Sequence, residues 1–390
     1  MWLYVLKRVF GFVPTLFAVT IIGFILLANA PGDAVDSLVM SSNSGGSLKT
    51  NQDIEQQKAH WRKQLGLDLP LFYFSICKLS EPDTLYKIHD NVQLEKTKEL
   101  LKTTGGYKNY LPKIIWYGSH NQYHRWLFGG YNSKGIIRGD FGLSISKKEP
   151  VIAIIKDKLI WSLFFSILSI VLAYAISIPI GIKIAQQPES KFSKGSQFIL
   201  FLMYSMPSFF VGVLLLMLFA NPDVLSIFPP SGVKPIEGYN DNAWLIEKII
   251  VSIPYIILPL ICYTYSSLAF ISKLTATSIQ EQLQLDYIKT AQAKGLSTKV
   301  IVWKHALKNS ALPLITVFSA LFPSIVGGSV IIESIFTIPG MGLETVKAII
   351  SLDYPVVIAI ITLSSVLTIF SYLLADILYA WVDPRIRITK

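Results

Sequence analysis

The stretch LIWSLFFSILSIVLAYAISIPI, from Leu159 to Ile180, contains no charged side chain. An α-helix rises 1.5 Å per residue, so about 20 apolar residues cross the roughly 30 Å hydrocarbon core of a bilayer. The stretch therefore predicts a transmembrane helix, whose end we place at Ile184.

Similar apolar runs recur along the 390-residue chain, which is 52% hydrophobic and only 15% charged. Its mean hydropathy of +0.49 excludes an ordinary soluble protein. Several runs contain proline, which membrane helices tolerate because neighbouring helices and hydroxyl groups satisfy the freed carbonyls. We predict an all-α membrane protein with six transmembrane helices. The other five expected spans are Val9–Ala28, Phe198–Ala220, Ile249–Ile271, Ala311–Ile332 and Val356–Ala380.

The first apolar run has an alternative interpretation as a signal peptide. Lys7 and Arg8 precede it, and Ala28-Asn29-Ala30 resembles a cleavage site. A run of about 20 residues exceeds the usual 7 to 15 of a signal peptide and is long enough to span. The length favours a retained membrane helix.

Basic residues in short loops accumulate on the cytoplasmic side of a membrane. Here they flank alternate ends of the predicted spans, whereas the opposite segments, 221–248 and 333–355, hold three lysines against seven acidic residues. Both termini are therefore predicted to be cytoplasmic. The basic residues on that side are Lys7, Arg8, Lys183, Lys191, Lys194, Lys273, Lys289, Lys294, Lys299, Lys304, Lys308, Arg385, Arg387 and Lys390.

Residues 31–158 separate the N-terminal helix, residues 1–30, from a core of five helices, residues 159–390. A segment this long is translocated regardless of its charge, so it lies outside in the predicted topology. Its polar composition and aromatic clusters predict a folded or partly folded extracytoplasmic insert domain with a helix near Asn91–Lys102 and a Gly/Ser-rich stretch over residues 41–47. The aromatic residues are Trp116, Tyr117, Tyr123, Trp126 and Phe128.

The expected spans hold almost no ionisable residue, although secondary transporters usually carry such residues at mid-membrane depth. Glu333 and Asp376 lie near helix ends, where we expect structural or interfacial roles, such as Asp376 pairing with Arg385 or Arg387. The chain also lacks a phosphate-binding G-x-x-x-x-G-K-[ST] loop, so any ATPase is another chain.

We predict no catalytic, cofactor or metal site. His120 and His124 are four residues apart and can share a helix face as metal ligands, but they lack the glutamate of a zinc hydrolase, and an ordinary histidine pair is the better interpretation. The net charge of +10 is explained by membrane-flanking lysines and one polar domain rather than by nucleic acid.

The cytoplasmic segment 272–310 is far longer than a turn and is patterned as two short helices around a break. Ala291 and Ala293 permit close approach of a partner, and Gly295 can end a helix in the left-handed conformation. The lysines alone also fit an amphipathic helix on anionic headgroups. That alternative explains Asp286, Thr290 and the small residues poorly, so we predict an interaction element.

This segment resembles the EAA loop of bacterial ABC-importer permeases, in the oligopeptide, dipeptide and nickel branch, and most resembles the B-type oligopeptide subunit. The match comprises Asp286, Tyr287, Thr290, Ala291, Lys294, Gly295 and Leu296, followed by His305, Asn309 and Leu312-Pro313. Further matching blocks are Gly139-Asp140-Phe141-Gly142, Phe228 to Gly232, Glu333 to Gly342, Asp353-Tyr354-Pro355 and Asp383-Pro384-Arg385. Residues 38–137 agree only in scattered positions and look longer than the usual outer loop.

The resemblance implies that the loop forms a coupling helix that docks into an ATPase subunit. Thr290, Ala291 and Gly295 would form the docking surface, with Asp286, Tyr287, Lys294 and Leu296 around it. Lys289 occupies the glutamate position of the signature, so the salt contact of that glutamate is not carried over. Implied partners are a second homologous permease, two ATPase subunits that hold ATP and Mg, an extracytoplasmic solute-binding protein, and the lipid of the bacterial inner membrane. From the position of the insert domain alone, we hypothesise that it assists the docking of the solute-binding protein.

The expected function is that of the permease subunit of an ATP-driven importer for oligopeptides or dipeptides. Nickel chelates, opines and glycosides are alternative solutes, and an autonomous secondary transporter or channel and a membrane-anchored receptor or assembly factor are alternative classes. Pathway-lining candidates, for which helix packing is an equal explanation, are Ser205, Ser208, Phe209, Ser324, Gly327 and Gly328.

Overall fold

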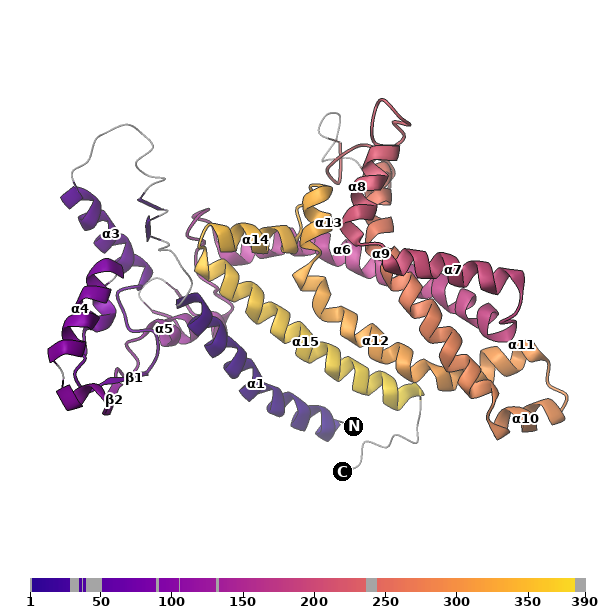
Figure 1. Ribbon diagram of the computed structural model, residues 1–390, viewed down its shortest axis with the longest axis horizontal. Coiled ribbons are helices and arrows are strands. Elements are labelled where there is room, and N and C mark those ends of the chain that lie inside the picture. The colour runs from indigo at the N-terminus through magenta and orange to yellow at the C-terminus, as the bar shows by residue number, and fades with distance from the viewer. Residues whose placement is uncertain are drawn as a thin grey trace. The chain divides into compact units, whose positions relative to one another are not determined.

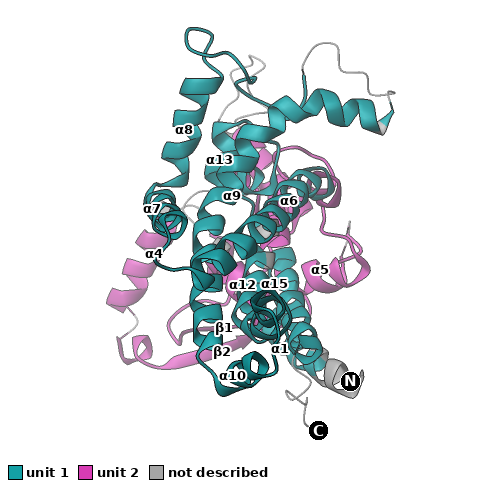
Figure 2. Ribbon diagram, turned by 90° about the vertical axis from the view of Figure 1, so that its right-hand side faces the viewer, with its two compact units in different colours: residues 1–16, 155–347, 362–390 teal, residues 17–154, 348–361 magenta. Residues whose placement is uncertain are grey.

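The computed structural model describes residues 2–28, 35–36, 38–39, 51–88, 91–104, 106–130, 133–235 and 244–382, and these residues are mostly helical (Figure 1). The chain divides into two compact units (Figure 2). Unit 1 contains residues 1–16, 155–347 and 362–390, and unit 2 contains residues 17–154 and 348–361. Three long helices, α1 (Trp2–Ala28), α6 (Val151–Gln186) and α15 (Tyr354–Val382), pass from one unit into the other.

Unit 2 contains most of the predicted insert domain. Its elements are α3 (Asn51–Leu65), β1 (Phe74–Lys78), η1 (Leu85–Lys87), α4 (Asn91–Thr104), η2 (Gly106–Asn109), β2 (Pro112–Trp116), α5 (Gln122–Phe128) and η3 (Ile136–Arg138). The strands form an antiparallel two-stranded ribbon. Helix α4 confirms the helix predicted near Asn91–Lys102, whereas the Gly/Ser-rich stretch lies outside the described residues.

Aromatic packing joins this unit to the second half of α1. The ring of Phe24 is buried and lies 5.2 Å from each of the rings of Tyr123 and Trp126. The hydroxyl groups of Thr20 and Tyr123 are hydrogen-bonded at 2.8 Å. Aromatic side chains bury large areas and favour edge-to-face contacts, so this cluster anchors α5 on α1.

Unit 1 is built from helices, in chain order from α6. They are α7 (Lys191–Ser205), α8 (Ser208–Phe219), α9 (Leu245–Leu283), α10 (Asp286–Ala293), α11 (Thr298–Val300), the π-helical segment η4 (Ile301–Ala306), α12 (Leu307–Gly327), α13 (Val330–Ile335) and α14 (Met341–Ile350), which ends in unit 2. The α6 helix starts at Val151, eight residues before the predicted start of its span at Leu159.

Among the described residues, three helices are individually long and apolar enough to cross a membrane: α6, α9 and α15. The pair α7 and α8 makes a fourth if it counts as one span. Helix α1 contains a shorter apolar segment, Phe10–Leu26, and α12 has 21 residues. A membrane protein with several apolar helices is therefore confirmed, and the full set of six spans stays a prediction.

The predicted span Phe198–Ala220 is not one straight helix. It breaks between α7 and α8, whose axes are bent by 101°. Met206 adopts an extended conformation before Pro207, because proline disfavours the helical region for the residue before it and has no N–H to continue the ladder. The prolines at 14, 179, 254, 259 and 323 lie inside helices as predicted.

Asp376 forms an ion pair with Arg8 of α1, with 3.0 Å between Nη2 and Oδ2. The sequence had indicated Arg385 or Arg387 as its partner, and both of these lie outside the described residues. The observed pair joins the N-terminal half of α1 to the C-terminal part of α15 within unit 1.

Candidate functional site

The predicted interaction element forms a short helix, α10, set between α9 and the return into α12 (Figure 1). One face of α10 is apolar: Ile288 is fully buried and Ala291 is 7% exposed. These side chains pack in one cluster with Ile182 of α6, Ile279 of α9 and Val302 of η4. The apolar face fixes α10 on the ends of three other elements.

The opposite face of α10 is exposed and polar. Asp286, Lys289 and Thr290 lie there, and the Lys289 ammonium group pairs with the Asp286 carboxylate at 2.8 Å. Both partners are solvent-exposed, so this pair contributes at most about 1 kcal/mol to stability. The hydroxyl of Tyr287 donates to Oε1 of Gln282 at 2.8 Å, which ties the start of α10 to the end of α9.

Gly295 ends this helix as the sequence predicts, with a φ of +75°. Its N–H donates to the Gln292 carbonyl at 2.9 Å, and the N–H of Lys294 donates to that of Thr290 at 3.1 Å. No heavy atom lies within 4 Å of the position that a Cβ of residue 295 would occupy. Lys294, Gly295 and Leu296 are all exposed, so they extend the exposed face of α10.

Ala291 was expected on the docking surface, but its side chain packs against the chain's own core. Ile288, which the motif did not single out, lies beside it on the same buried face. The helical spacing of i and i+3 that puts these two residues together was visible in the sequence, but the sequence did not show which face the core would cover.

The chain returns from this loop through η4, a π-helical stretch with buried Ile301, Val302 and Ala306. Short π-helical segments are rare and occur frequently at functional sites. Here the stretch connects the α10 loop directly to α12.

The block from Glu333 to Gly342 begins with a second notable residue, Glu333, which lies in α13. The Glu333 side chain is completely buried, which agrees with the structural role expected for it. It accepts hydrogen bonds from the Ser162 hydroxyl at 3.1 Å, the Tyr263 hydroxyl at 3.3 Å, and the backbone N–H groups of Leu343 at 2.7 Å and Ser329 at 3.3 Å. Glu333 therefore links α6, α9 and α14.

Glycines make room for this carboxylate. A Cβ on Gly340 would lie 2.4 Å from the carboxyl carbon of Glu333, and a Cβ on Gly328 would lie 2.2 Å from its Oε1 atom. Gly328 was a candidate for the pathway wall, and its packing against Glu333 supplies a structural reason for the glycine. Gly327, its neighbour, has no heavy atom near its Cβ position.

Residues of the other sequence blocks also form hydrogen bonds across long stretches of the chain. The N–H of Gly232 donates to the carbonyl of Phe336 at 2.8 Å, and Phe228 packs in the same cluster. In unit 2, the buried Asp353 carboxylate accepts from the N–H groups of Ile145 and Ser146, both at 3.1 Å, directly after the Gly139–Gly142 block. The block from Phe228 to Gly232 thus contacts the block from Glu333 to Gly342, and Asp353 contacts the residues that follow the Gly139–Gly142 block.

The remaining candidates for the pathway wall lie at the junction of α7 and α8 and in α12. Ser205 ends α7 and its hydroxyl donates to the Phe201 carbonyl at 2.9 Å. Ser208 and Phe209 begin α8, where the Phe209 ring is exposed. Ser324 lies in α12, but the structure does not describe its side chain.

The two histidines considered as metal ligands have ordinary surroundings. The Nδ1 atom of His124 lies 3.0 Å from the Tyr73 hydroxyl, and His120 is exposed.

Comparison with known proteins gives the same assignment. The family model described as "Binding-protein-dependent transport system inner membrane component" matches residues 177–388. The oligopeptide transport system permease protein AppB of Bacillus subtilis (strain 168) is 38% identical, over 68% of this chain and 80% of its own length.

Two further relatives match more of the chain. The peptidoglycan transport system permease protein YejB of Agrobacterium fabrum is 30% identical over 98% of this chain and 97% of its own length. The dipeptide transport system permease protein DppB of Escherichia coli (strain K12) is 30% identical over 84% and 95%. The alignment with YejB of Agrobacterium fabrum covers 98% of this chain, so it includes the segment between α1 and α6. An insert of similar size is therefore present in that relative. The chain belongs to the family of binding-protein-dependent transport system inner membrane components, in the branch that contains the oligopeptide and dipeptide permeases.

Proposed function

We propose that this inner membrane protein is a non-enzymatic permease subunit of an ATP-driven importer for oligopeptides or dipeptides, and that α10 couples it to an ATPase. The relatives named for oligopeptide and dipeptide transport support the solute class. The single observation that carries the coupling role is the two-faced α10, whose buried side is fixed to α6, α9 and η4 while its other side is exposed.

The proposed mechanism follows from this placement. A partner that binds differently to the inward-open and outward-open states shifts the equilibrium between them by its difference in binding free energy. Contacts on Asp286, Thr290, Lys294, Gly295 and Leu296 would move α10 as one body. Ile288 and Ala291 would carry that movement to the membrane helices.

The proposed assembly has this chain paired with a second, homologous permease, two ATPase subunits holding ATP and Mg, and an extracytoplasmic solute-binding protein. The chain itself would hold no cofactor or metal. We also propose that it crosses the inner membrane six times with both termini in the cytoplasm, which places α10 on the ATPase side.

A bulky substitution on the exposed face tests the coupling role. Thr290→Trp leaves the buried face of α10 intact, so it should reduce association with the ATPase and abolish uptake while the chain remains folded. Gln187→Trp is the matched control, because Gln187 is also polar and exposed at the α6–α7 turn. ATPase co-purification and peptide uptake would be measured separately. Normal association and uptake in Thr290→Trp would contradict the proposal.

Uptake assays with the complete assembly reconstituted in vesicles distinguish the alternative solutes. Accumulation of a nickel chelate or a glycoside, with no accumulation of peptides, would replace the solute and keep the coupling. Uptake that persists without any ATPase would instead favour a secondary transporter, and an intact phenotype on disrupting α10 would favour a receptor.

We also propose that the insert domain assists the docking of the solute-binding protein. Surface substitutions test this role better than a deletion does. Removing residues 38–131 would uncover Phe24 and Ile358, which pack with Tyr123 and Leu127. A deletion would therefore damage the folded chain as well as any docking surface.

A further inference from the structure

The β-ribbon of unit 2 presents a solvent-exposed apolar face. Phe74 pairs with Trp116 and Ile76 pairs with Ile114 across the two strands, and all four side chains lie on the same face. Ile76, Ile114 and Trp116 are 68%, 69% and 72% exposed. We call Phe74, Ile76, Ile114 and Trp116 the ribbon face.

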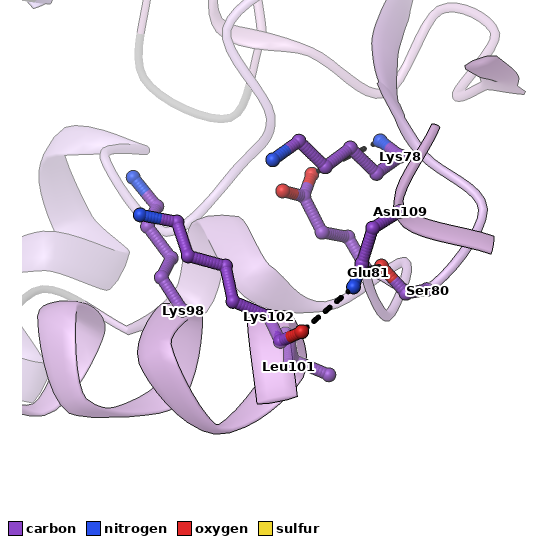
Figure 3. Close-up of a pocket in the computed structure, with 7 residues that line it drawn as sticks. All are labelled: Lys78, Ser80, Glu81, Lys98, Leu101, Lys102 and Asn109. Atoms are coloured by element: carbon purple, nitrogen blue, oxygen red, sulfur yellow. Dashed lines mark hydrogen bonds between the residues drawn. The ribbon is translucent and has the colours of Figure 1, made fainter. Parts of the chain in front are cut away.

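A small lysine-rich pocket adjoins the ribbon face. It has a volume of about 40 Å³ and its walls come from the end of β1, the following loop, α4 and η2. Lys98 and Lys102 project from α4 toward the side on which Lys78 and Glu81 lie (Figure 3). Lys78 is the last residue of β1 and shares its face with Phe74 and Ile76, so pocket and ribbon face are continuous.

The charges of this pocket favour an anion. Three lysines and one glutamate line it, and in the described part of the chain neither Lys98 nor Lys102 forms an ion pair. Like charges at positions i and i+4 of a helix destabilise it, so the two lysines repel each other until an anion lies between them. A volume of this size admits one phosphate or carboxylate group and excludes a whole peptide.

Other contacts hold the pocket in place. The Asn109 side-chain amide donates to the Lys102 carbonyl at 2.9 Å, and the Ser80 hydroxyl donates to Oδ1 of Asn109 at 2.5 Å. The backbone N–H of Lys78 donates to the Glu81 carboxylate at 3.2 Å. These bonds fix α4 against the end of β1, and the three lysines line the pocket between them.

We propose that the ribbon face and the lysine pocket together form a docking surface for the anionic headgroup region of the membrane in which the chain is anchored. Exposed aromatic and aliphatic residues beside lysines are the composition of segments that lie in the membrane interface. The segment that carries this surface follows the apolar helix α1 and precedes the apolar helix α6 in the chain. Attachment to membrane helices keeps the local concentration of lipid around the surface high. The lysine pocket binds a lipid phosphate, and the ribbon face enters the interface next to it.

The test uses the full-length chain in vesicles that contain nitroxide-labelled lipid, either with phosphatidylglycerol or with phosphatidylcholine alone. A fluorophore is attached at Ile114→Cys in a Cys77→Ser background. The control label is on the native Cys77, a free cysteine on the opposite face of the ribbon; Cys262 is buried in both forms. Nitroxide lipid should quench the label at position 114 much more than the label at position 77, and only in vesicles with phosphatidylglycerol.

Charge variants test the pocket. Each lysine near an anionic surface contributes roughly fivefold to binding, so Lys98→Gln with Lys102→Gln should lower the ratio of bound to free ribbon by about 25-fold. Lys96→Gln, on the same helix but outside the pocket, should leave quenching close to that of the unmodified chain. Equal quenching in both kinds of vesicle, or quenching insensitive to Lys98 and Lys102, would overturn the anion site.

Two further results would overturn the whole proposal. One is a label at position 114 that stays accessible to water in every vesicle. The other is a label that becomes shielded only when the extracytoplasmic binding protein is added, which would assign the surface to a protein partner.

Discussion

Glu333 in unit 1 accepts hydrogen bonds from four donors on one buried carboxylate. Glu333→Ala would leave these donors unpaired, and each unsatisfied buried group costs about 1–3 kcal/mol. We expect a loss of roughly 2–4 kcal/mol in stability. Glu333→Gln should cost less, because its amide oxygen still accepts.

The measurement for Glu333 is the thermal unfolding midpoint of the purified chain in detergent, followed by tryptophan fluorescence. Glu189→Ala serves as the control, because Glu189 is exposed and pairs with the exposed Lys194. The control should unfold close to the unmodified chain. An unchanged midpoint in Glu333→Ala would show that the carboxylate does not hold α6, α9 and α14 together.

Asp140 in unit 2 gives a prediction for pH. The backbone N–H groups of Lys134 and Gly142 donate to its carboxylate at 2.7 and 2.9 Å and lower its pKa below the usual value. Because the folded pKa is depressed, the carboxylate stabilises the loop above the ordinary aspartate pKa of about 4, and the contribution disappears as pH falls through the folded pKa.

Protease resistance of the loop from Ser133 to Gly142 measures this effect. The loop should stay resistant from pH 7 down to about 4 and become sensitive below that range. Asp140→Asn should be more sensitive at pH 7 and should lose most of the pH dependence. Identical profiles for the two proteins would refute the role assigned to this carboxylate.

At the scale of elements, α6 and α9 approach each other closely at Gly181. A Cβ at this position would lie 2.6 Å from the Cβ of Thr275 and 2.7 Å from the carbonyl oxygen of Ser272. Gly181→Ala must therefore separate the two helices or distort their backbones. We expect a loss of about 1–3 kcal/mol, as for other overpacked sites.

Gly195→Ala is the matched control for Gly181→Ala. Gly195 also lies inside a helix, α7, but no heavy atom lies within 4 Å of its Cβ position. Alanine there should leave stability unchanged or raise it by up to about 1 kcal/mol, because glycine is the poorer helix former. Equal unfolding midpoints for the two variants would contradict the close approach of α6 and α9.

The elements show where sequence patterns are sufficient. Apolar runs located α6, α9 and α15, because the requirement for about 20 apolar residues is a local property. The prolines have different effects: Pro179 lies inside α6, whereas Pro207 lies at the break between α7 and α8. The outcome at each proline depends on whether neighbouring groups satisfy the freed carbonyls, which is a tertiary property.

At the scale of the whole molecule, the sequence indicated the blocks but not their partners. Ser162 and Glu333 are 171 positions apart, and Ser146 and Asp353 are 207 apart. No local periodicity relates such residues. The inward position of Ala291 and the lysine pocket between β1 and α4 were equally hidden, because each depends on which faces pack together.

The central claim is that this chain is a passive gate moved by an ATPase through α10. The most direct measurement is peptide accumulation in vesicles that contain either the purified chain alone or the chain with its second permease, its ATPase subunits and its binding protein. The account predicts no accumulation by the chain alone, and accumulation against a gradient by the full assembly only when ATP is supplied. Uphill accumulation by the chain alone would contradict it.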